Sequence, residues 1–380
     1  MVATLGLRPV GEGERRLAPD LARGVMLALI AVANSAVYLY GRPYGIRQHI
    51  VEHDLPNRVA AALSMTFVDG RAYPMFAALF GYGMVQIWNR RRDDAEGLRI
   101  LRRRSRWLLL FGAAHAVLLF SGDVLGVYGL LGLVICLLLR VRDRTLLVLA
   151  GAWLVPVALL SALAYSVPHD PEERAIFWSL AVEDPLTALA LRPVEWLMTP
   201  VGMTGVFTAG LVGVWAARRD LMAVPDGLMR RAAVGGPLIG ALGGLPLGLA
   251  AIGVLDVEGT GAVMALNAVH AVSGIAAGLG YAALIALLAQ RIGTRRGPLV
   301  TALSACGRRS MTCYLLQSVV FVALLPPYAI GLGGRLGSAA TVALALGTWA
   351  ATVAVAECMR RAGARGPAET LLRRLTYRRG

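Results

Sequence analysis

Residues 59–88 read VAAALSMTFVDGRAYPMFAALFGYGMVQIW, an apolar run that is interrupted near its middle by Asp69, Gly70 and Arg71. One straight helix over this run would be about 45 Å long, half again the hydrocarbon thickness of a bilayer. Gly70 weakens a helix, and Pro74 removes one of its hydrogen bonds. The stretch therefore predicts a membrane-spanning segment that is broken at its charged residues.

The composition of the whole chain agrees with a membrane protein. The 380 residues are 57% hydrophobic and 16% charged, and the mean hydropathy is +0.62. Soluble domains carry about a quarter charged residues, so an ordinary soluble enzyme and a disordered chain are both excluded. Because a spanning helix needs about 20 apolar residues, we predict an all-α, polytopic transmembrane helix bundle. Its ten predicted spans are 21–40, 59–88, 107–120, 124–139, 145–167, 196–217, 232–255, 263–290, 311–330 and 336–357.

The arginines alternate between the loops. All 38 basic residues are Arg, and 31 of them lie in the segments 1–23, 89–106, 140–144, 218–231, 291–309 and 358–380. Because basic loops stay on the cytoplasmic side, this pattern predicts that both termini lie on the cytoplasmic side of a bacterial inner membrane. The surplus positive charge then indicates contact with anionic membrane lipids, not with nucleic acid.

This topology divides the chain into three parts. We predict a cytoplasmic N-terminal segment at 1–20, a transmembrane bundle at 21–357 and a cytoplasmic amphipathic tail at 358–380. The connection 168–195 is the largest outer segment, and it predicts an amphipathic helix that lies on the outer surface.

The charges inside the second span are the first candidate site. An Arg at mid-membrane costs about 2.5–3.5 kcal/mol on insertion scales, so Arg71 should face the protein interior and have a partner. Asp69 is two residues away and would point to a different helix face. Candidate partners are Asp20, His115 and Asp123. The pair predicts a substrate- or ion-binding site, or else a structural ion pair.

The first span adds three polar residues. Asp20 and Arg23 are three apart, so they can pair on one helix face as an anchor or as part of a binding site. Asn34 lies mid-span, where its amide needs a hydrogen-bond partner inside the bundle.

Histidines supply candidates for a general base. His115 lies in the third span, with Asp123 at its outer end and Tyr128 on the next helix; it is a packing residue or a proton-handling group. His49 and His53, in the outer loop 41–58, are four apart, so a helix would put both on one face. With no third ligand placed, we expect no metal, and nothing in the sequence indicates a cofactor.

Small residues recur at every fourth position in two later spans, at Gly236, Gly240, Gly244 and Gly248 and again at Gly274, Gly278 and Ala282, in register with His270. This spacing lets helices pack closely, within the chain or across a homodimer. Asn267 and His270 lie near that seam as a second polar site. In the ninth span Ser310, Tyr314 and Gln317 form one polar stripe, which lines a cavity or joins helices.

Several stretches together resemble the YeiB family of bacterial membrane proteins. They are Pro19 to Gly24, Asp69-Gly70-Arg71 with Met75 to Gly83, the block of His115, Gly122-Asp123, Tyr128-Gly129 and Gly132, Gly307 to Gln317, and Gly366 to Tyr377. The family is distantly similar to membrane acyltransferases of the heparan acetyltransferase type. That resemblance implies a catalytic role for Asn34 and for a histidine of the following outer loop, for which His49 and His53 are the candidates.

Three functions stay open at this point. In the first, an acyl group passes to an acceptor outside the cytoplasm, with His53 or His115 as the base and Arg23 and Arg71 holding the donor. In the second, a transporter binds a small solute or lipid at Asp69, Arg71, His115 and Asp123. In the third, the protein has no turnover. Candidate catalytic residues are His53, His115 and Asn34; candidate substrate-binding residues are Asp20, Arg23, Asp69, Arg71, Asp123, Tyr128, Ser310, Tyr314 and Gln317.

Overall fold

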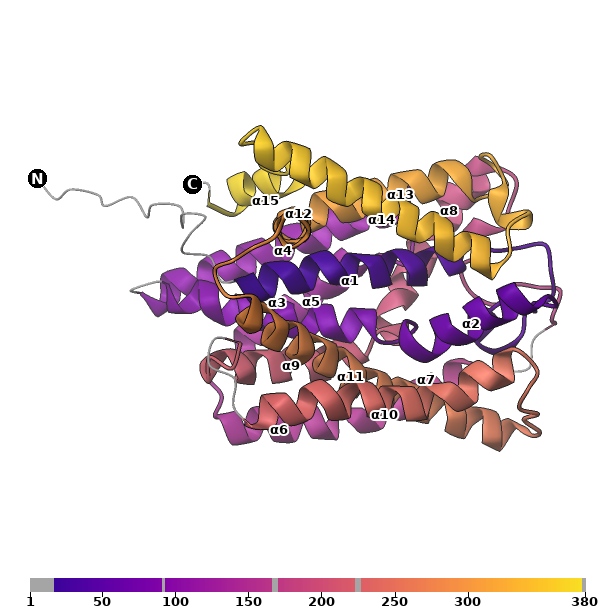
Figure 1. Cartoon of the computed structure of the whole chain (residues 1–380), viewed down its shortest axis with the longest axis horizontal. Coiled ribbons are helices and arrows are strands. Elements are labelled where there is room, and N and C mark those ends of the chain that lie inside the picture. The colour runs from indigo at the N-terminus through magenta and orange to yellow at the C-terminus, as the bar shows by residue number, and fades with distance from the viewer. Residues whose placement is uncertain (1–16, 91–92, 166–169, 223–226, 378–380) are drawn as a thin grey trace, which may run out of the picture.

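The protein is an elongated bundle of helices (Figure 1), here in a computed structural model that describes residues 17–90, 93–165, 170–222 and 227–377. Within these ranges the one β contact is an isolated bridge between Tyr44 and Ile50. The predicted all-α class is confirmed. The helices are α1 Leu17–Ala36, η2 Ile46–Gln48, α2 Leu55–Phe67, α3 Ala72–Asn89, α4 Asp94–Leu118, α5 Val124–Leu138, α6 Asp143–Ala152, α7 Leu154–Ala164, η3 Trp178–Leu180, α8 Pro185–Gly202, α9 Gly205–Arg218, α10 Gly227–Ala251, α11 Thr260–Ile292, α12 Pro298–Arg308, α13 Ser310–Leu324, η4 Leu332–Gly334, α14 Ser338–Arg361 and α15 Pro367–Tyr377.

Fewer helices have spanning length than the sequence predicts. Of the described helices, five stretches are long and apolar enough to cross a membrane: α1, α6 with α7, α10, α11 and α14. The pair α8 and α9, bent by 55°, makes six. The count falls short of ten because α2, α5 and α13 have 13, 15 and 15 residues, below the roughly 20 that a span needs. Ten spans, cytoplasmic termini and one broken span made of α2 and α3 stay predictions.

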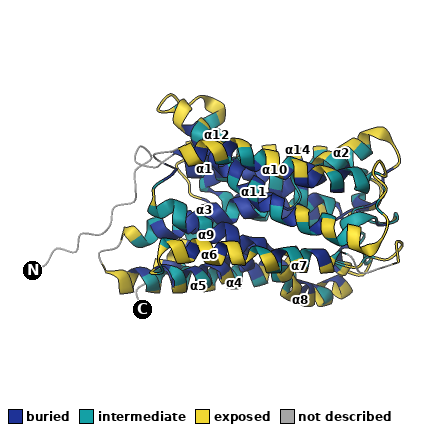
Figure 2. Ribbon diagram, turned by 90° about the horizontal axis from the view of Figure 1, so that it is seen from below, coloured by how far each residue is buried: buried dark blue, intermediate teal, exposed yellow. Residues whose placement is uncertain are grey.

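Two ends of the bundle differ in what they carry. The start of α1 and the helix α15 lie at one end, which we call the tail end (Figure 1). Residues 41–53 and 170–181 lie at the other, the loop end, where the Tyr44 N–H donates to the Pro171 carbonyl over 2.7 Å. Residues 1–16 and 378–380, parts of the predicted terminal segments, lie outside the described residues. Buried residues are concentrated along α1, α3, α9 and α11, and exposed ones on the outer helices (Figure 2).

Aspartate caps set where several helices begin. The Asp93 side chain accepts a hydrogen bond from Ala95 N over 2.9 Å and starts α4 well before the predicted span at 107–120. The Asp123 carboxylate caps α5 through Gly126 N over 2.6 Å. α4 and α5 pack as a tight hairpin, because Gly112 and Gly126 let their backbones meet.

The largest outer connection is only partly a loop. The Asp184 carboxylate accepts a hydrogen bond from Thr187 N over 2.7 Å and starts α8 at Pro185, which runs past 195 to Gly202. Arg192, on α8, is buried and donates to the Val117 and Leu118 carbonyls at the end of α4, at 3.1 and 3.0 Å. This helix is therefore anchored to the bundle by a charged side chain.

The predicted amphipathic tail is the helix α15. Its Glu369 carboxylate accepts hydrogen bonds from Met311 N and Thr312 N at 2.8 and 3.1 Å, which satisfies free N–H groups at the start of α13. Leu372, three residues further on and so on the same side of the helix, is buried. The tail helix is thus docked onto the bundle rather than extended from it.

Candidate functional site

The chain turns sharply between α2 and α3, at residues 68–71. Gly70 has φ +74°, a backbone conformation that residues with a side chain rarely adopt. The turn fits against α11 at two glycines of the predicted stripe: a Cβ at Gly274 would lie 2.6 Å from the Gly70 carbonyl oxygen, and one at Gly278 would lie 2.7 Å from that of Arg71. The small residues predicted to pack helices together therefore hold the charged turn.

Arg71 is fully buried at this turn. Its guanidinium donates to the carbonyl oxygens of Asp69 and, over 3.0 Å, Gly240, and lies 2.7 Å from His270 Nε2. A Cβ at Gly244 would lie 2.1 Å from Arg71 Nη2, so the glycine stripe of α10 makes room for the guanidinium.

The partners of Arg71 differ from those the sequence suggested. Asp20, His115 and Asp123 do not contact it, and within the described residues no carboxylate lies within 4.0 Å of its guanidinium. Arg71 and Asp69 are connected through the imidazole of His270, because α11 passes beside the turn, and this could not be read from the sequence of the span alone.

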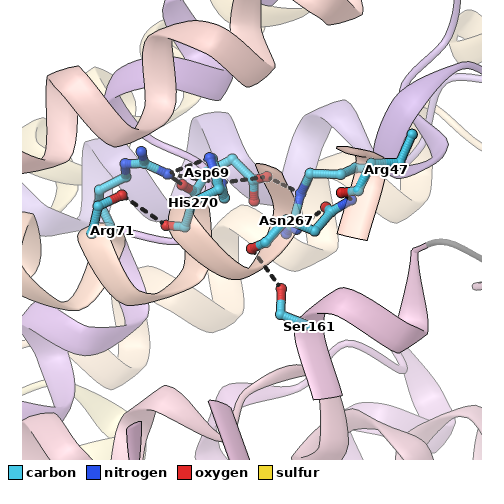
Figure 3. A network of polar contacts seen from close by, with 8 residues as sticks. Arg47, Asp69, Arg71, Ser161, Asn267 and His270 are labelled. Atoms are coloured by element: carbon cyan, nitrogen blue, oxygen red, sulfur yellow. Dashed lines mark hydrogen bonds and ion pairs between the residues drawn. The ribbon is translucent and has the colours of Figure 1, made fainter. Parts of the chain in front are cut away.

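Asp69 belongs to a polar network that reaches the loop end (Figure 3). Its Oδ2 accepts a hydrogen bond from Arg47 Nε over 2.9 Å and lies 3.5 Å from His270 Nε2. Arg47 Nη1 donates to Asn267 Oδ1 over 3.1 Å, and its guanidinium lies 4.1 Å from the ring centre of Tyr165. The second polar site predicted at Asn267 and His270 is therefore continuous with the first.

Arg47 has an unusual backbone conformation. It has φ +56° and ψ +28°, and Gln48 also has a positive φ of +61°. Such conformations cost on the order of 1–3 kcal/mol and concentrate at functional sites. The segment is held by Gln48, whose Oε1 accepts a hydrogen bond from Ala175 N over 2.7 Å.

A cavity of about 410 Å³, the loop-end cavity, opens beside Asp69. Its walls are mostly apolar and aromatic, and among its polar lining residues are Asn34, Arg47, His49 and Asp69. Burial lowers the pKa of His49 from its ordinary value of 6.5, so this imidazole is neutral at pH 7.

A second cavity of about 680 Å³, the tail-end cavity, lies toward the opposite end of the bundle. Five arginines line it, together with three acids; these residues are Arg23, Arg90, Arg104, Arg218, Arg308, Asp20, Asp220 and Glu369. The predicted pair of Asp20 and Arg23 is confirmed at 3.6 Å. Five of the six basic segments of the sequence contribute lining residues to this cavity.

Arg104 is one of these arginines. Within the described residues it has no acidic partner, and its guanidinium lies 5.3 Å from the ring centre of Phe80. Arg104 precedes the apolar part of α4. Burial and the neighbouring Arg23 guanidinium lower its pKa to about 10, so it is still charged at pH 7. Two guanidinium groups that share one cavity attract an anion.

A histidine–aspartate pair lies between the two cavities. His115 Nδ1 and Asp123 Oδ1 are 2.8 Å apart, and both side chains are buried. The ring of Tyr314 packs against the imidazole at 5.0 Å between centres and lines the tail-end cavity. Gly122 lines the loop-end cavity, and Val124 lines both.

The second ring nitrogen of this histidine has no hydrogen bond. His115 Nε2 is buried without a partner among the described residues. A histidine oriented through Nδ1 by a carboxylate, with Nε2 unoccupied, has the arrangement of a general base.

The remaining predicted residues divide between the cavities. Ser310 and Tyr128 line the tail-end cavity, whereas Gln317 joins helices through a 3.5 Å hydrogen bond to the Leu27 carbonyl. His53 is exposed and lines neither cavity. The segment between His49 and α2 is not helical, so these two histidines do not share a helix face. In the described ranges no group of three His, Cys, Asp or Glu side chains could hold a metal ion.

Sequence reasoning missed two parts of this arrangement. Arg47 is one arginine of the predicted outer loop 41–58, and nothing in its sequence neighbourhood signals a left-handed conformation. Glu195 is buried, and its carboxylate accepts hydrogen bonds from Ser121 and Ser179 at 2.5 and 2.6 Å. The sequence signal for a buried polar site at Glu195 is its charge within a largely apolar stretch.

Comparison with known proteins agrees with the family resemblance. Residues 216–379 match a family model described as "Protein of unknown function (DUF418)". The chain is 25% identical to the uncharacterized protein YxaH of Bacillus subtilis (strain 168), over 98% of this chain and 96% of the relative. It is 27% identical to the uncharacterized protein YeiB of Escherichia coli (strain K12), over 96% and 97%. The chain is thus an α-helical protein with several apolar helices of membrane-spanning length, and it is similar over nearly its whole length to these two uncharacterized proteins.

Proposed function

We propose that the protein is an acyltransferase of the bacterial cytoplasmic membrane, with a donor site in the tail-end cavity and an acceptor site in the loop-end cavity. The observation that carries this proposal is the His115–Asp123 pair, buried between the two cavities with Nε2 unoccupied. The two cavities adjoin at Ile30 and Val124, which line both.

The chemistry follows from the pair. Asp123 holds the Nδ1–H of His115, so Nε2 takes the proton of an acceptor hydroxyl or amine as that group attacks the donor carbonyl. The new ester or amide bond forms, the thioester bond of the donor breaks, and the proton on Nε2 passes to the leaving thiolate. The proton that leaves the acceptor thus ends on the released thiol, and this transfer needs no bound metal or cofactor.

The arginines support an anionic donor. Arg23 and Arg104 share one wall of the tail-end cavity, where a phosphorylated carrier such as an acyl-CoA would place its negative groups. Phe80 and Tyr128, on the same cavity, provide an apolar surface for the acyl chain. Arg71 has no part in donor binding, because it is enclosed at the turn.

Thiol release from acetyl-CoA by the purified protein in detergent tests the proposal. We expect His115→Gln to abolish release and His53→Gln to retain it. Arg104→Ala should raise KM for the donor about tenfold or more, and Arg102→Ala, an exposed arginine of the same helix that does not line the cavity, should not. Release that survives His115→Gln would refute the proposed base.

A transporter is the second candidate, favoured by one observation. The two cavities approach each other from opposite ends of the bundle, as the two half-paths of an alternating-access transporter do. Asp69 and Asp123 would then bind or relay the transported ion. Solute flux in liposomes, lost in Arg71→Ala or Asp69→Asn and without any thiol release, would favour transport. Absence of both flux and thiol release in the native protein would favour a protein without turnover.

A further inference from the structure

The loop-end cavity has an accessible carboxylate oxygen. The Asp69 side chain is 27% exposed, and only its Oδ2 is engaged, by Arg47 and His270. Its Oδ1 makes no hydrogen bond with the described residues. Because an ionised carboxylate is an acceptor only, this oxygen requires a ligand with an N–H or O–H group.

The charges around Asp69 select among such ligands. Two guanidinium groups, Arg47 and Arg71, stand against two carboxylates, Asp69 and Glu195, of which Glu195 also lines the cavity, so these charges balance. An ammonium group at Asp69 is disfavoured because the Arg47 guanidinium, 2.9 Å away, already neutralises that carboxylate. An anionic group is disfavoured too, since it would meet the carboxylate first: the Arg47 side chain is only 10% exposed and Arg71 is fully enclosed. An uncharged hydroxyl satisfies both conditions.

The cavity also opens sideways onto an apolar surface. Three of its lining residues are themselves largely exposed: Trp178 at 42%, Met198 at 59% and Val201 at 45%. Met198 and Val201 lie on α8, whose exposed face continues with Leu186, Leu189, Val194 and Leu197. In a membrane protein such a face contacts lipid, so a ligand with a hydrocarbon chain can enter from the bilayer.

We infer that the loop-end cavity binds an amphiphile with an uncharged hydroxyl headgroup, whose hydroxyl donates to Asp69 Oδ1 and whose chain leaves past Met198. Asn34 and His49, both neutral, lie in the same wall and suit further hydroxyls. The role of this amphiphile as the acyl acceptor rests on the proposed function. The binding of the amphiphile to the cavity does not.

Three probes with the same 18-carbon chain test the headgroup. We would measure binding of monoolein, oleylamine and oleic acid to the purified protein in detergent at pH 7.5, without any donor, by native mass spectrometry. Monoolein should bind about tenfold or more tightly than either charged probe, because only its headgroup brings no unbalanced charge into a cavity whose own charges are paired. A preference for oleic acid or oleylamine, or equal binding of all three, would overturn the inference.

A matched pair of variants tests the location. Met198→Trp fills the cavity entrance and should weaken monoolein binding about tenfold, whereas Leu197→Trp, on an exposed residue of α8 that does not line the cavity, should leave it unchanged. Asp69→Asn should reduce the preference for monoolein; if that variant does not fold, the α8 pair decides alone. Equal binding of monoolein by the two tryptophan variants would contradict the proposed location of the binding site.

Binding and turnover can be told apart with one further variant. His115→Gln does not touch the loop-end cavity, so it should bind monoolein normally while releasing no thiol. Binding without any release from the native protein would overturn the proposed function alone, and release to acceptors without monoolein binding would overturn this inference alone.

Discussion

His115 Nδ1 lies 2.8 Å from Asp123 Oδ1, and the same Asp123 carboxylate caps α5 through its second oxygen, 2.6 Å from Gly126 N. One carboxylate thus orients the proposed base and starts the helix that follows. The two tasks can be separated, because an asparagine caps a helix about as well as an aspartate but carries no charge.

We therefore expect Asp123→Asn to fold with nearly native stability and to lose about 100-fold or more in thiol release. Asp123→Ala should lose the same activity and in addition lower the free energy of unfolding by about 1 kcal/mol, through the lost cap. Thermal unfolding in detergent and the release assay measure the two effects. Full activity in Asp123→Asn would show that Asp123 is only a cap.

Gly244 tests the space that α10 leaves for Arg71. Gly244→Ala places a methyl group 2.1 Å from Arg71 Nη2 and 2.8 Å from the Thr66 carbonyl oxygen, so α10 must move outward. We expect a loss of about 1–3 kcal/mol in the free energy of unfolding, as in overpacked cores. The control is Gly235→Ala on the same helix, which meets nothing within 4 Å and should be neutral or stabilising. Equal stability of the two variants would contradict this packing.

Glu369 tests the docking of the tail helix. Glu369→Ala removes the acceptor of the Met311 and Thr312 N–H groups, so α15 should detach more often from α13. Limited proteolysis should then cut between α14 and α15 at least several-fold faster than in the native protein. Glu357→Ala, which removes only ion pairs to Arg360 and Arg361 within α14, should leave the rate unchanged.

His49 gives the stability a pH dependence. Its pKa is lowered by burial in the folded protein, so the unfolded chain binds a proton first as the pH falls. The contribution of His49 is therefore complete above about pH 6.5 and is lost as the pH falls below that value. The unfolding temperature should decline less from pH 8 to pH 5 in His49→Gln than in the native protein. His53→Gln, at an exposed position, should keep the native decline; an identical decline in all three would refute this role of His49.

Much of the fold could be predicted because hydrophobicity acts locally. The helical class and several of the spanning helices follow from apolar length, whereas charge alternation predicts only that the basic segments share one side of the membrane. Helix boundaries could be predicted less well, since Asp93 starts α4 inside a basic segment between two predicted spans, and α8 begins after Asp184 and runs past residue 195 into the next predicted span.

The candidate site could be predicted only in part. The residues His115 and Asp123 could be predicted to be candidates that lie close together, because they are eight residues apart around one turn, but the hydrogen bond between them could not. The partners of Asp69 and Arg71 could not be identified, since they come from positions some 20 to 200 residues distant, among them Arg47, Gly240 and His270. A charge in a span signals that partners exist, and the packing of distant helices decides which they are.

The distance along the chain between Arg71 and its partners has a consequence for biosynthesis. The Gly240 carbonyl and the His270 imidazole are 169 and 199 residues downstream of Arg71. At about 5–20 residues per second, the ribosome needs on the order of ten seconds or more to deliver them after Arg71 has been made. During that interval the guanidinium must be held by the insertion machinery, by water or by lipid phosphates, and α2 and α3 can reach their final positions only after α10 and α11 have entered the membrane.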